Sequence, residues 1–286
     1  MPAEPARFVL TLSCGDRRGI VAAVANSIAS QDCNIVESAQ YGDPDSGRFF
    51  MRVAFAAPPS VTRESFVSGF TPVATGYGFD WKVHDLAVKP RVMILVSKMG
   101  HCLNDLLYRN SIGQLPMELV SVASNHETMR RRVENEGLPF HYVPVEGRSK
   151  AEQEAEILGL IEGERIDLVV LARYMQVLSD DMSAKLAGRV INIHHSFLPS
   201  FKGAKPYHRA HERGVKLIGA TAHYVTAELD EGPIIEQDVG RVDHSMSAEE
   251  MIAIGRDIEN TVLARAIKFH LEHRVLLNGS RTVVFR

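Results

Sequence analysis

Four short apolar runs in the last two-thirds of the chain constrain its fold most strongly. They are VMILV (92–96), MELVSVA (117–123), LVVLA (168–172) and VINI (190–193). Continuous Val, Ile and Leu are typical of strands that are buried on both faces. Helical stretches lie between them, such as 149–162, which is rich in strong helix formers. This alternation predicts an α/β domain in which helices cover both faces of a mostly parallel sheet.

The pattern changes after this sheet. Residues 216–242 read KLIGATAHYVTAELDEGPIIEQDVGRV, which predicts longer, antiparallel strands joined by a loop. A final helix is expected from SAEEM, because Ser247 and Glu250 have the spacing of a capping box. Its apolar positions continue through Ile254, Ile258, Val262 and Ala266.

The first 86 residues predict a separate, smaller fold. Alternating apolar residues from Phe8 indicate a strand, and Asp16 is expected to cap the helix that follows it. Turn-forming residues 42–47 separate two further strands, before a helix over about 61–76 and a closing strand within 79–88. The order βαββαβ is that of a ferredoxin-like sandwich. With AVKPR (87–91) as a linker, we predict domains of residues 1–87 and 88–286. In the first helix, apolar residues recur at helical spacing at Ile20, Val21, Val24 and Ile28.

Composition narrows the class of protein. A chain of 286 residues has room for about two domains, and 45% hydrophobic residues support a sizeable core. The net charge of −3 argues against nucleic acid as the main partner. Without a signal-peptide pattern or an apolar run of about 18 residues, neither export nor membrane insertion is expected. Three cysteines with no CxxC spacing fit a reducing compartment, so a cytoplasmic location is predicted.

Covalent catalysis and metal binding are both weakly signalled. Ser196 lies in HHSFL rather than in G-x-S-x-G, and Cys102 beside His101 is more simply explained as a small residue in a turn. His194 and His195 point to opposite faces of a strand, so they cannot ligate one ion from it. The other histidine pair, His208 and His211, lies in a segment that reads as a solvated helix, and we predict no metal.

The alternation of side chains along a strand also indicates which residues lie together. Asn192 and His194 share one face at the carboxyl end of a parallel strand, where open α/β sheets bind ligands. His223 lies in the next strand, and the loop LDEGP then places Asp230 before a Gly232-Pro233 turn. A carboxylate can activate water or an amine, worth roughly 10²–10⁴-fold. An amide or a protonated imidazole can stabilise an oxyanion, worth about 10²–10³-fold. Each residue alone also has a structural explanation, but in combination they favour acyl transfer without a covalent intermediate.

These residues carry a resemblance to a known family. NIHHSFLPSFKGAKPYHRA (192–210), followed by AHYVTAELDEGPII (222–235), resembles the formyltransferases that use 10-formyltetrahydrofolate, and the match covers about 90–286. The resemblance implies a Rossmann-like domain in which Asn192, His194 and Asp230 are catalytic. It implies no cofactor and no metal, since the folate is the substrate. VVLARYMQVLS (169–179) resembles the segment that lines the pterin pocket, which places the ring near Met175, Gln176, Val177 and Leu178.

A second resemblance concerns the first domain. Its turn SCGDRRGI (13–20) is similar to that of ACT domains, which bind small amino acids and tend to pair, so a homo-oligomer is expected. Asp16 and Gly19 lie where such an effector would be contacted, although turning a strand into a helix requires the same residues. An ACT domain joined to a formyltransferase-type domain is the layout of the formyltetrahydrofolate deformylases. That layout implies hydrolysis to tetrahydrofolate and formate, and a place in one-carbon metabolism and purine biosynthesis.

Two features favour hydrolysis over transfer. Glycinamide ribonucleotide formyltransferases carry a Gly-rich phosphate loop after the first strand, whereas SKMGHCLNDLL (97–107) contains only Gly100. His195 also stands where the transferases usually have Pro. Transfer to an amine, in glycinamide ribonucleotide or an amino sugar, is the alternative activity, and a non-catalytic amino-acid sensor is the alternative from another class. His195 can contact substrate or pack, and His223 can support the site or fill the core.

Overall fold

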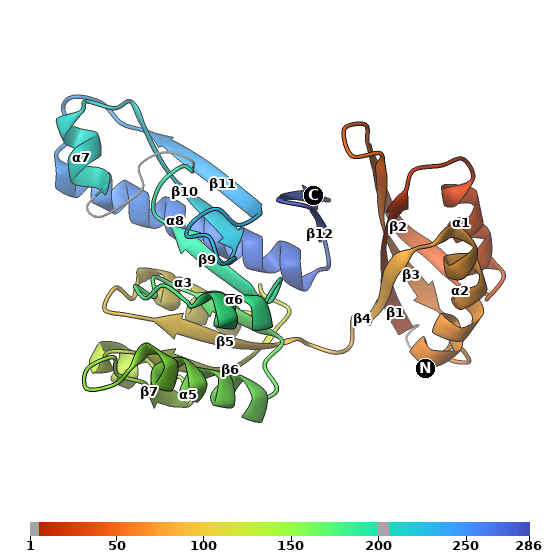
Figure 1. Ribbon diagram of the computed structural model, residues 1–286, viewed down its shortest axis with the longest axis horizontal. Helices are drawn as coiled ribbons and strands as arrows, with labels where there is room; N and C mark the ends of the chain where they lie inside the picture. Colours follow the sequence, from red (N-terminus) through yellow and green to blue (C-terminus); the bar gives the residue numbers. More distant parts are fainter. Residues whose placement is uncertain (1–5, 199–205) are drawn as a thin grey trace. The chain divides into compact units, whose positions relative to one another are not determined.

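The computed structural model describes residues 6–198 and 206–286 (Figure 1). These residues divide into two compact units. The first unit ends at Lys89 but also contains Glu272–Asn278 and Thr282–Arg286 from the end of the chain. The second unit consists of Pro90–Leu271 and Gly279–Arg281. The first unit is therefore discontinuous in sequence, which the apolar pattern did not indicate.

The first unit contains the predicted βαββαβ arrangement. Its four strands form an antiparallel sheet in the order β2-β3-β1-β4, so the first and last strands of the chain order, β1 and β4, pair with each other. In this register Leu10 on β1 lies between Val53 on β3 and Val83 on β4. The elements are β1 (Ala6–Gly15), α1 (Ile20–Ala29), β2 (Asn34–Asp43), β3 (Arg48–Ala57), α2 (Arg63–Tyr77) and β4 (Asp80–Asp85).

The start of α1 differs from the prediction. Gly19 is the N-cap residue, with φ at 91° and no side-chain cap hydrogen bond, so Asp16 does not cap this helix. Asp16 instead donates its backbone N–H to Gly47 O at 2.9 Å. A glycine adopts this positive φ without steric cost, which lets the chain turn directly from strand into helix. Of the four apolar residues at helical spacing, Ile20, Val24 and Ile28 are buried and Val21 is 39% exposed.

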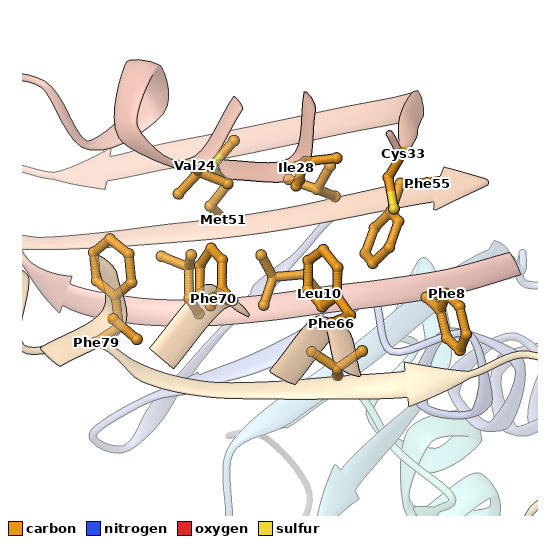
Figure 2. Close-up of a cluster of buried hydrophobic side chains, with 14 of the residues drawn as sticks. Phe8, Leu10, Val24, Ile28, Cys33, Met51, Phe55, Phe66, Phe70 and Phe79 are labelled. Carbon is orange, nitrogen blue, oxygen red and sulfur yellow. The ribbon is translucent and has the colours of Figure 1, made fainter. Parts of the chain in front are cut away.

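The core of the first unit is strongly aromatic (Figure 2). Phe66 and Phe70 from α2 are fully buried, and the Phe66 ring lies 4.5 Å from that of Phe55 on β3. Phe70 meets Trp81 on β4 edge-on at 4.9 Å. Such aromatic pairs add about 0.5–1.5 kcal/mol beyond the area they bury. These contacts hold α2 on the same face of the sheet as α1.

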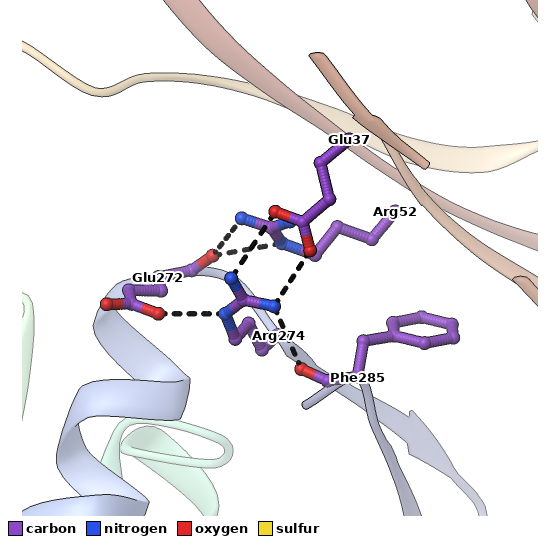
Figure 3. A network of polar contacts seen from close by, with 5 residues as sticks. All are labelled: Glu37, Arg52, Glu272, Arg274 and Phe285. Carbon is purple, nitrogen blue, oxygen red and sulfur yellow. Dashed lines mark hydrogen bonds and ion pairs between the residues drawn. The ribbon is translucent and has the colours of Figure 1, made fainter. Parts of the chain in front are cut away.

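Within the first unit, a polar network joins residues from the end of the chain to the strands β2 and β3 (Figure 3). Arg52 on β3 is only 4% exposed and donates to the backbone oxygen of Glu272 at 3.1 and 3.2 Å. Arg274 pairs with Glu37 on β2 at 3.0 Å and also donates to Phe285 O at 3.2 Å. Because Met51 and Val53 face the helices, alternation places Arg52 on the opposite face of the sheet. The final hairpin, β12 (Val275–Asn278) with β13 (Arg281–Val284), was not predicted.

The second unit is built on a seven-stranded sheet in the order β11-β10-β9-β8-β5-β6-β7. Strands β5 to β9 are parallel, whereas β10 is antiparallel to both β9 and β11. This confirms the four predicted apolar strands and the antiparallel pair that follows them. The strands are β5 (Arg91–Val96), β6 (Glu118–Ser124), β7 (Phe140–Tyr142), β8 (Leu168–Leu171), β9 (Val190–His194), β10 (Leu217–Tyr224) and β11 (Ile234–Arg241).

Helices flank this sheet, and the longest of them, α8, packs on β9, β10, β11 and α3 (Figure 1). A separate cluster joins Met93 and Leu95 of β5 to Ile157 and Ile161 of α5. Two predicted helix starts are confirmed, because Ser149 caps α5 and Ser247 exchanges bonds of 2.7 and 3.2 Å with Glu250. The helices are α3 (His101–Ser111), η1 (Glu127–Met129), α4 (Arg130–Glu134), α5 (Lys150–Gly163), α6 (Asp180–Lys185), α7 (Pro206–Glu212) and α8 (Ala248–Leu271).

None of the helices in the described part of the chain is long and apolar enough to span a membrane.

Candidate active site

Two of the predicted site residues lie on strand β9. Asn192 and His194 lie at its carboxyl end, next to Leu171 at the end of the parallel strand β8. On its other side β9 pairs with β10, and the register sets His223 directly opposite Asn192. The two side chains meet, with Asn192 Nδ2 3.2 Å from His223 Nε2. The antiparallel neighbour therefore adds a second imidazole to the face on which Asn192 lies.

The loop between β10 and β11 brings Asp230 to the same place. Its Oδ2 lies 3.2 Å from His194 Nδ1, and its Oδ1 lies 3.7 Å from His223 Nε2. Asp230 has φ at 57°, a left-handed conformation that Asp tolerates better than most residues. Gly232 is required just after it, because a Cβ there would lie 1.8 Å from Tyr224 O. A strained but rigid loop thus holds the carboxylate against the two strands.

The Asp230 carboxylate is ionised at neutral pH. Burial by itself raises the pKa of this group, but hydrogen bonds and charges from His194 and His223 outweigh burial and hold the pKa well below its ordinary value. His194 is only 5% exposed. With His194 Nδ1–H donating to Asp230, its Nε2 is left buried with no hydrogen-bond partner among the described residues. A buried nitrogen of this kind is available to a bound substrate.

His223 is oriented from its other nitrogen. Nδ1 lies 2.9 Å from the backbone oxygen of Tyr224, so Nδ1 carries the proton and donates it there. When the ring is neutral, Nε2 accepts from Asn192 Nδ2, and when the ring is protonated, Nε2–H faces the Asp230 carboxylate 3.7 Å away. This arrangement fixes the Asn192 amide with one N–H on His223 and leaves its second N–H for the cavity.

The His195 ring stacks on that of His194 instead of pointing to the opposite face as predicted, because β9 ends at His194 and strand alternation does not extend to His195. The two ring centroids are 5.0 Å apart with an interplanar angle of 25°. Burial lowers the pKa of His195 to about 4, with further lowering from the charges of Arg173 and His194. His195 is therefore neutral near pH 7 and contributes a hydrogen-bonding ring rather than a charge.

All these side chains line one cavity of about 570 Å³, as does the predicted pterin segment. Leu178 is buried, whereas Met175 and Val177 are more than half exposed. The Met175 N–H donates to Ser97 Oγ at 3.0 Å, which fixes this segment to the end of β5. Apolar side chains on a backbone held in this way suit a flat heterocycle. The predicted residues that line the cavity are Met175, Gln176, Val177, Leu178, Asn192, His194, His195, His223 and Asp230.

A second group of cavity residues was not predicted from the sequence. Glu259 on α8 is 2% exposed and accepts from Tyr207 Oη at 2.8 Å, while its other oxygen lies 2.8 Å from His101 Nε2. Arg173 Nε lies 3.5 Å from the same carboxylate. Tyr207 belongs to the helix that reads as solvated, but the structure buries it to 8% exposure. The sequence did not indicate the burial of Tyr207, because its neighbours in the helix are polar and its hydrogen-bond partner Glu259 is 52 residues away in sequence.

In the described part of the chain, one group of side chains has possible metal-ligand atoms close enough together to surround an ion. Atoms of His101, Cys102 and Glu259 all lie within 4.8 Å of one another, and Cys102 lies in the helix α3 rather than in the turn expected for it. Burial and the Glu259 charge raise the pKa of the Cys102 thiol well above its usual value. Thiolate is the form that binds metals. Because Glu259 is also held by Tyr207 and Arg173, the donor set is poorly suited to an ion.

The predicted effector residues lie in the first unit. Asp16 and Gly19 are both in the turn between β1 and α1. The backbone conformation requires Gly19, as described above, and a Cβ there would also lie 3.1 Å from Tyr77 Oη. Residues 199–205, which complete the SFLP and FKGAKP part of the motif, lie outside the described residues.

Comparison with known proteins identifies the family. The formyl transferase family model matches residues 90–267. A formyltetrahydrofolate deformylase from Corynebacterium sp. (strain P-1) is 51% identical over 99% of this chain and 100% of its own length. This chain belongs to the formyltetrahydrofolate deformylase family. A solved deformylase from Burkholderia mallei agrees in structure, with 52% identity, a TM-score of 0.94, and coverage of 99% of this chain and 100% of its own.

A transferase of the same fold matches only part of this deformylase-family chain. Glycinamide ribonucleotide transformylase 1 from Symbiobacterium toebii is 29% identical with a TM-score of 0.66. It covers 69% of this chain and 95% of its own. The full-length likeness is therefore to deformylases.

Proposed function

We propose that the protein hydrolyses 10-formyltetrahydrofolate to tetrahydrofolate and formate. The observation that carries this proposal is the Asp230 carboxylate, which is held 3.2 Å from His194 Nδ1 beside Asn192 in a cavity of about 570 Å³. Full-length similarity to deformylases supports water as the acceptor. Roles for individual residues follow from the geometry and chemistry of this cluster.

Asp230 serves as the base. Its carboxylate orients a water molecule against the formyl carbon and takes a proton from it during attack, which is worth roughly 10²–10⁴-fold. Its low pKa keeps it ionised, and the two imidazoles keep it in place. Because a weak base gains little from proton transfer alone, orientation of the water by the fixed loop supplies an important share of the rate.

Asn192 and His194 stabilise the tetrahedral intermediate. The free N–H of the Asn192 amide and the Nε2 of a protonated His194 donate to the oxygen that becomes negative as water adds. Collapse of the intermediate breaks the C–N bond, and the proton taken from water passes to the departing nitrogen of tetrahydrofolate. His195 and His223 support these groups by stacking on His194 and by holding Asn192.

The competing activity is transfer of the formyl group to an amine. The same cluster serves either acceptor, so an assay decides between them. Purified protein with 10-formyltetrahydrofolate alone should release formate at a rate that does not depend on added glycinamide ribonucleotide. Slow turnover without an amine, rising strongly when an amine is added, would favour the transferase.

The first unit is proposed to be an ACT domain that binds a small amino acid through the turn containing Asp16 and Gly19. Its βαββαβ order and the layout shared with deformylases support this assignment. We propose in addition that the protein is a homo-oligomer, because ACT domains tend to pair, and that it works in the cytoplasm. The three cysteines are free and buried, in agreement with a reducing compartment. Calorimetry with glycine and with methionine tests the effector, and light scattering tests the assembly.

A further inference from the structure

We propose that Arg173 forms a binding subsite for the formate product, at the wall of the cavity beside His195. This inference rests on the proposed hydrolysis and adds to it a place for the small carboxylate that the reaction releases. It is carried by the burial of Arg173, its open hydrogen-bonding capacity, and its position relative to Asp230 and Glu259.

Arg173 is held in the cavity wall at a cost. The residue follows β8, is 6% exposed, and has φ at 62°. A non-glycine residue in this region costs on the order of 1–3 kcal/mol, and such residues cluster at ligand-binding sites. Its backbone oxygen accepts from Ser97 N–H at 3.3 Å, which keeps the strained residue in place. A buried arginine in a strained position needs a reason beyond packing.

The guanidinium retains donors for a ligand. Arg173 Nε makes no hydrogen bond to any residue that the structure describes. Its nearest anion, Glu259, lies 3.5 Å away, an ion pair without hydrogen-bond geometry. Glu259 is engaged elsewhere, with one oxygen accepting from Tyr207 and the other 2.8 Å from His101. The Glu259 carboxylate is thus fixed beside Arg173 without occupying the hydrogen-bond donors of the guanidinium. The planar arrangement of these donors suits a second carboxylate, that of a bound ligand.

Formate is the anion that the reaction would place here. It forms at the Asn192, His194 and Asp230 cluster, and it is ionised as soon as it leaves the tetrahedral intermediate. The ionised Asp230 then repels it, because two like charges in a cavity of low dielectric disfavour each other. Arg173 lines the same cavity and acts electrostatically on His195, the residue next to His194. Asp230 and Arg173 line the same cavity, so the product can pass within it from the carboxylate to the cation.

The test measures binding of ¹³C-labelled formate to the full-length protein by NMR, at constant ionic strength and without folate. Arg173→Gln should weaken formate binding about tenfold or more, because a charge-assisted hydrogen bond is lost. Glu259→Gln should strengthen it, because the neighbouring negative charge is removed. Arg265→Gln is the matched control, since this exposed arginine of α8 pairs with Asp238, is not among the residues that line the cavity, and should leave the affinity unchanged. The two buried variants are expected to change the formate affinity in opposite directions, whereas a general loss of structure would weaken binding in both.

A second variant guards against misfolding of Arg173→Gln. The double change Arg173→Gln with Glu259→Gln removes both members of the buried ion pair and should still bind formate weakly. No formate binding by the unaltered protein, unchanged binding in the Arg173 variants, or weaker binding in Glu259→Gln would each overturn the inference. Formate release from 10-formyltetrahydrofolate, measured in parallel, tests the proposed hydrolysis separately, because protein that releases formate without Arg173-dependent binding contradicts the subsite alone.

Discussion

Replacing Asp230 by Asn tests the proposed base with little disturbance of the loop. Asn matches Asp in shape and is equally tolerant of the left-handed backbone at φ 57°. Its amide oxygen can still accept from His194 Nδ1, now 3.2 Å from the Asp230 carboxylate. What is lost is the negative charge and with it the ability to take a proton from water.

The expected effect is large and kinetic. Loss of a general base lowers the rate by roughly 10²–10⁴-fold, which corresponds to about 3–5 kcal/mol of transition-state stabilisation. Binding of folate depends mainly on the cavity segment around Met175 and Val177, so kcat should fall much more than the affinity for substrate changes.

The assay is single-turnover release of formate from 10-formyltetrahydrofolate, compared with the unaltered protein. Asp238→Asn is a matched control, because Asp238 pairs with Arg265 in an exposed ion pair on β11 and should leave the rate within about twofold. Thermal unfolding of both variants reports whether the fold persists. Near-normal formate release by the Asp230 variant would refute its role as the base.

Four further expectations follow from pH and packing. Asp230 has a lowered pKa, so its contribution to stability is complete above pH ~4 and is lost in more acid solution; the difference in urea midpoint between the protein and Asp230→Asn should shrink there. His195 has its pKa lowered to about 4, so its ring should show no NMR titration between pH 6 and 8, and its contribution should make the protein less stable as pH falls from ~6.5 towards 4. Gly232→Ala forces a Cβ against a backbone carbonyl and should lower the free energy of unfolding by about 2–3 kcal/mol, as measured in urea. Phe66→Ala in the first unit should cost about 3–5 kcal/mol, followed by the fluorescence of Trp81, the single tryptophan.

The sequence predicted those features that depend on local pattern. Apolar runs identified the buried strands, and the spacing of Asn192 and His194 placed both on one face of β9. Asp230 was found only through a motif, because its approach to His194 depends on a loop 36 residues further along the chain. The resemblance therefore supplied what spacing alone does not provide.

Other features depended on long-range register or on backbone conformation. His223 faces Asn192 because of the antiparallel pairing of β9 with β10, which no local pattern specifies. The Arg173 and Glu259 pair joins elements 86 residues apart. Asp16 was misassigned as a cap because the positive φ of Gly19 starts the helix later. The last hairpin did have a signal, because Gly279-Ser280 is a common two-residue turn between strands.

The polar network around Arg52 has a consequence for synthesis of the chain. The carbonyl that this buried guanidinium binds belongs to Glu272, and Arg274, which binds Glu37, comes later still. A ribosome therefore completes the first unit only after it has made the second, so a fragment cut at the linker would expose an arginine that has lost the carbonyl it binds. The module that comes first in the sequence is complete only after the module that follows it has been made.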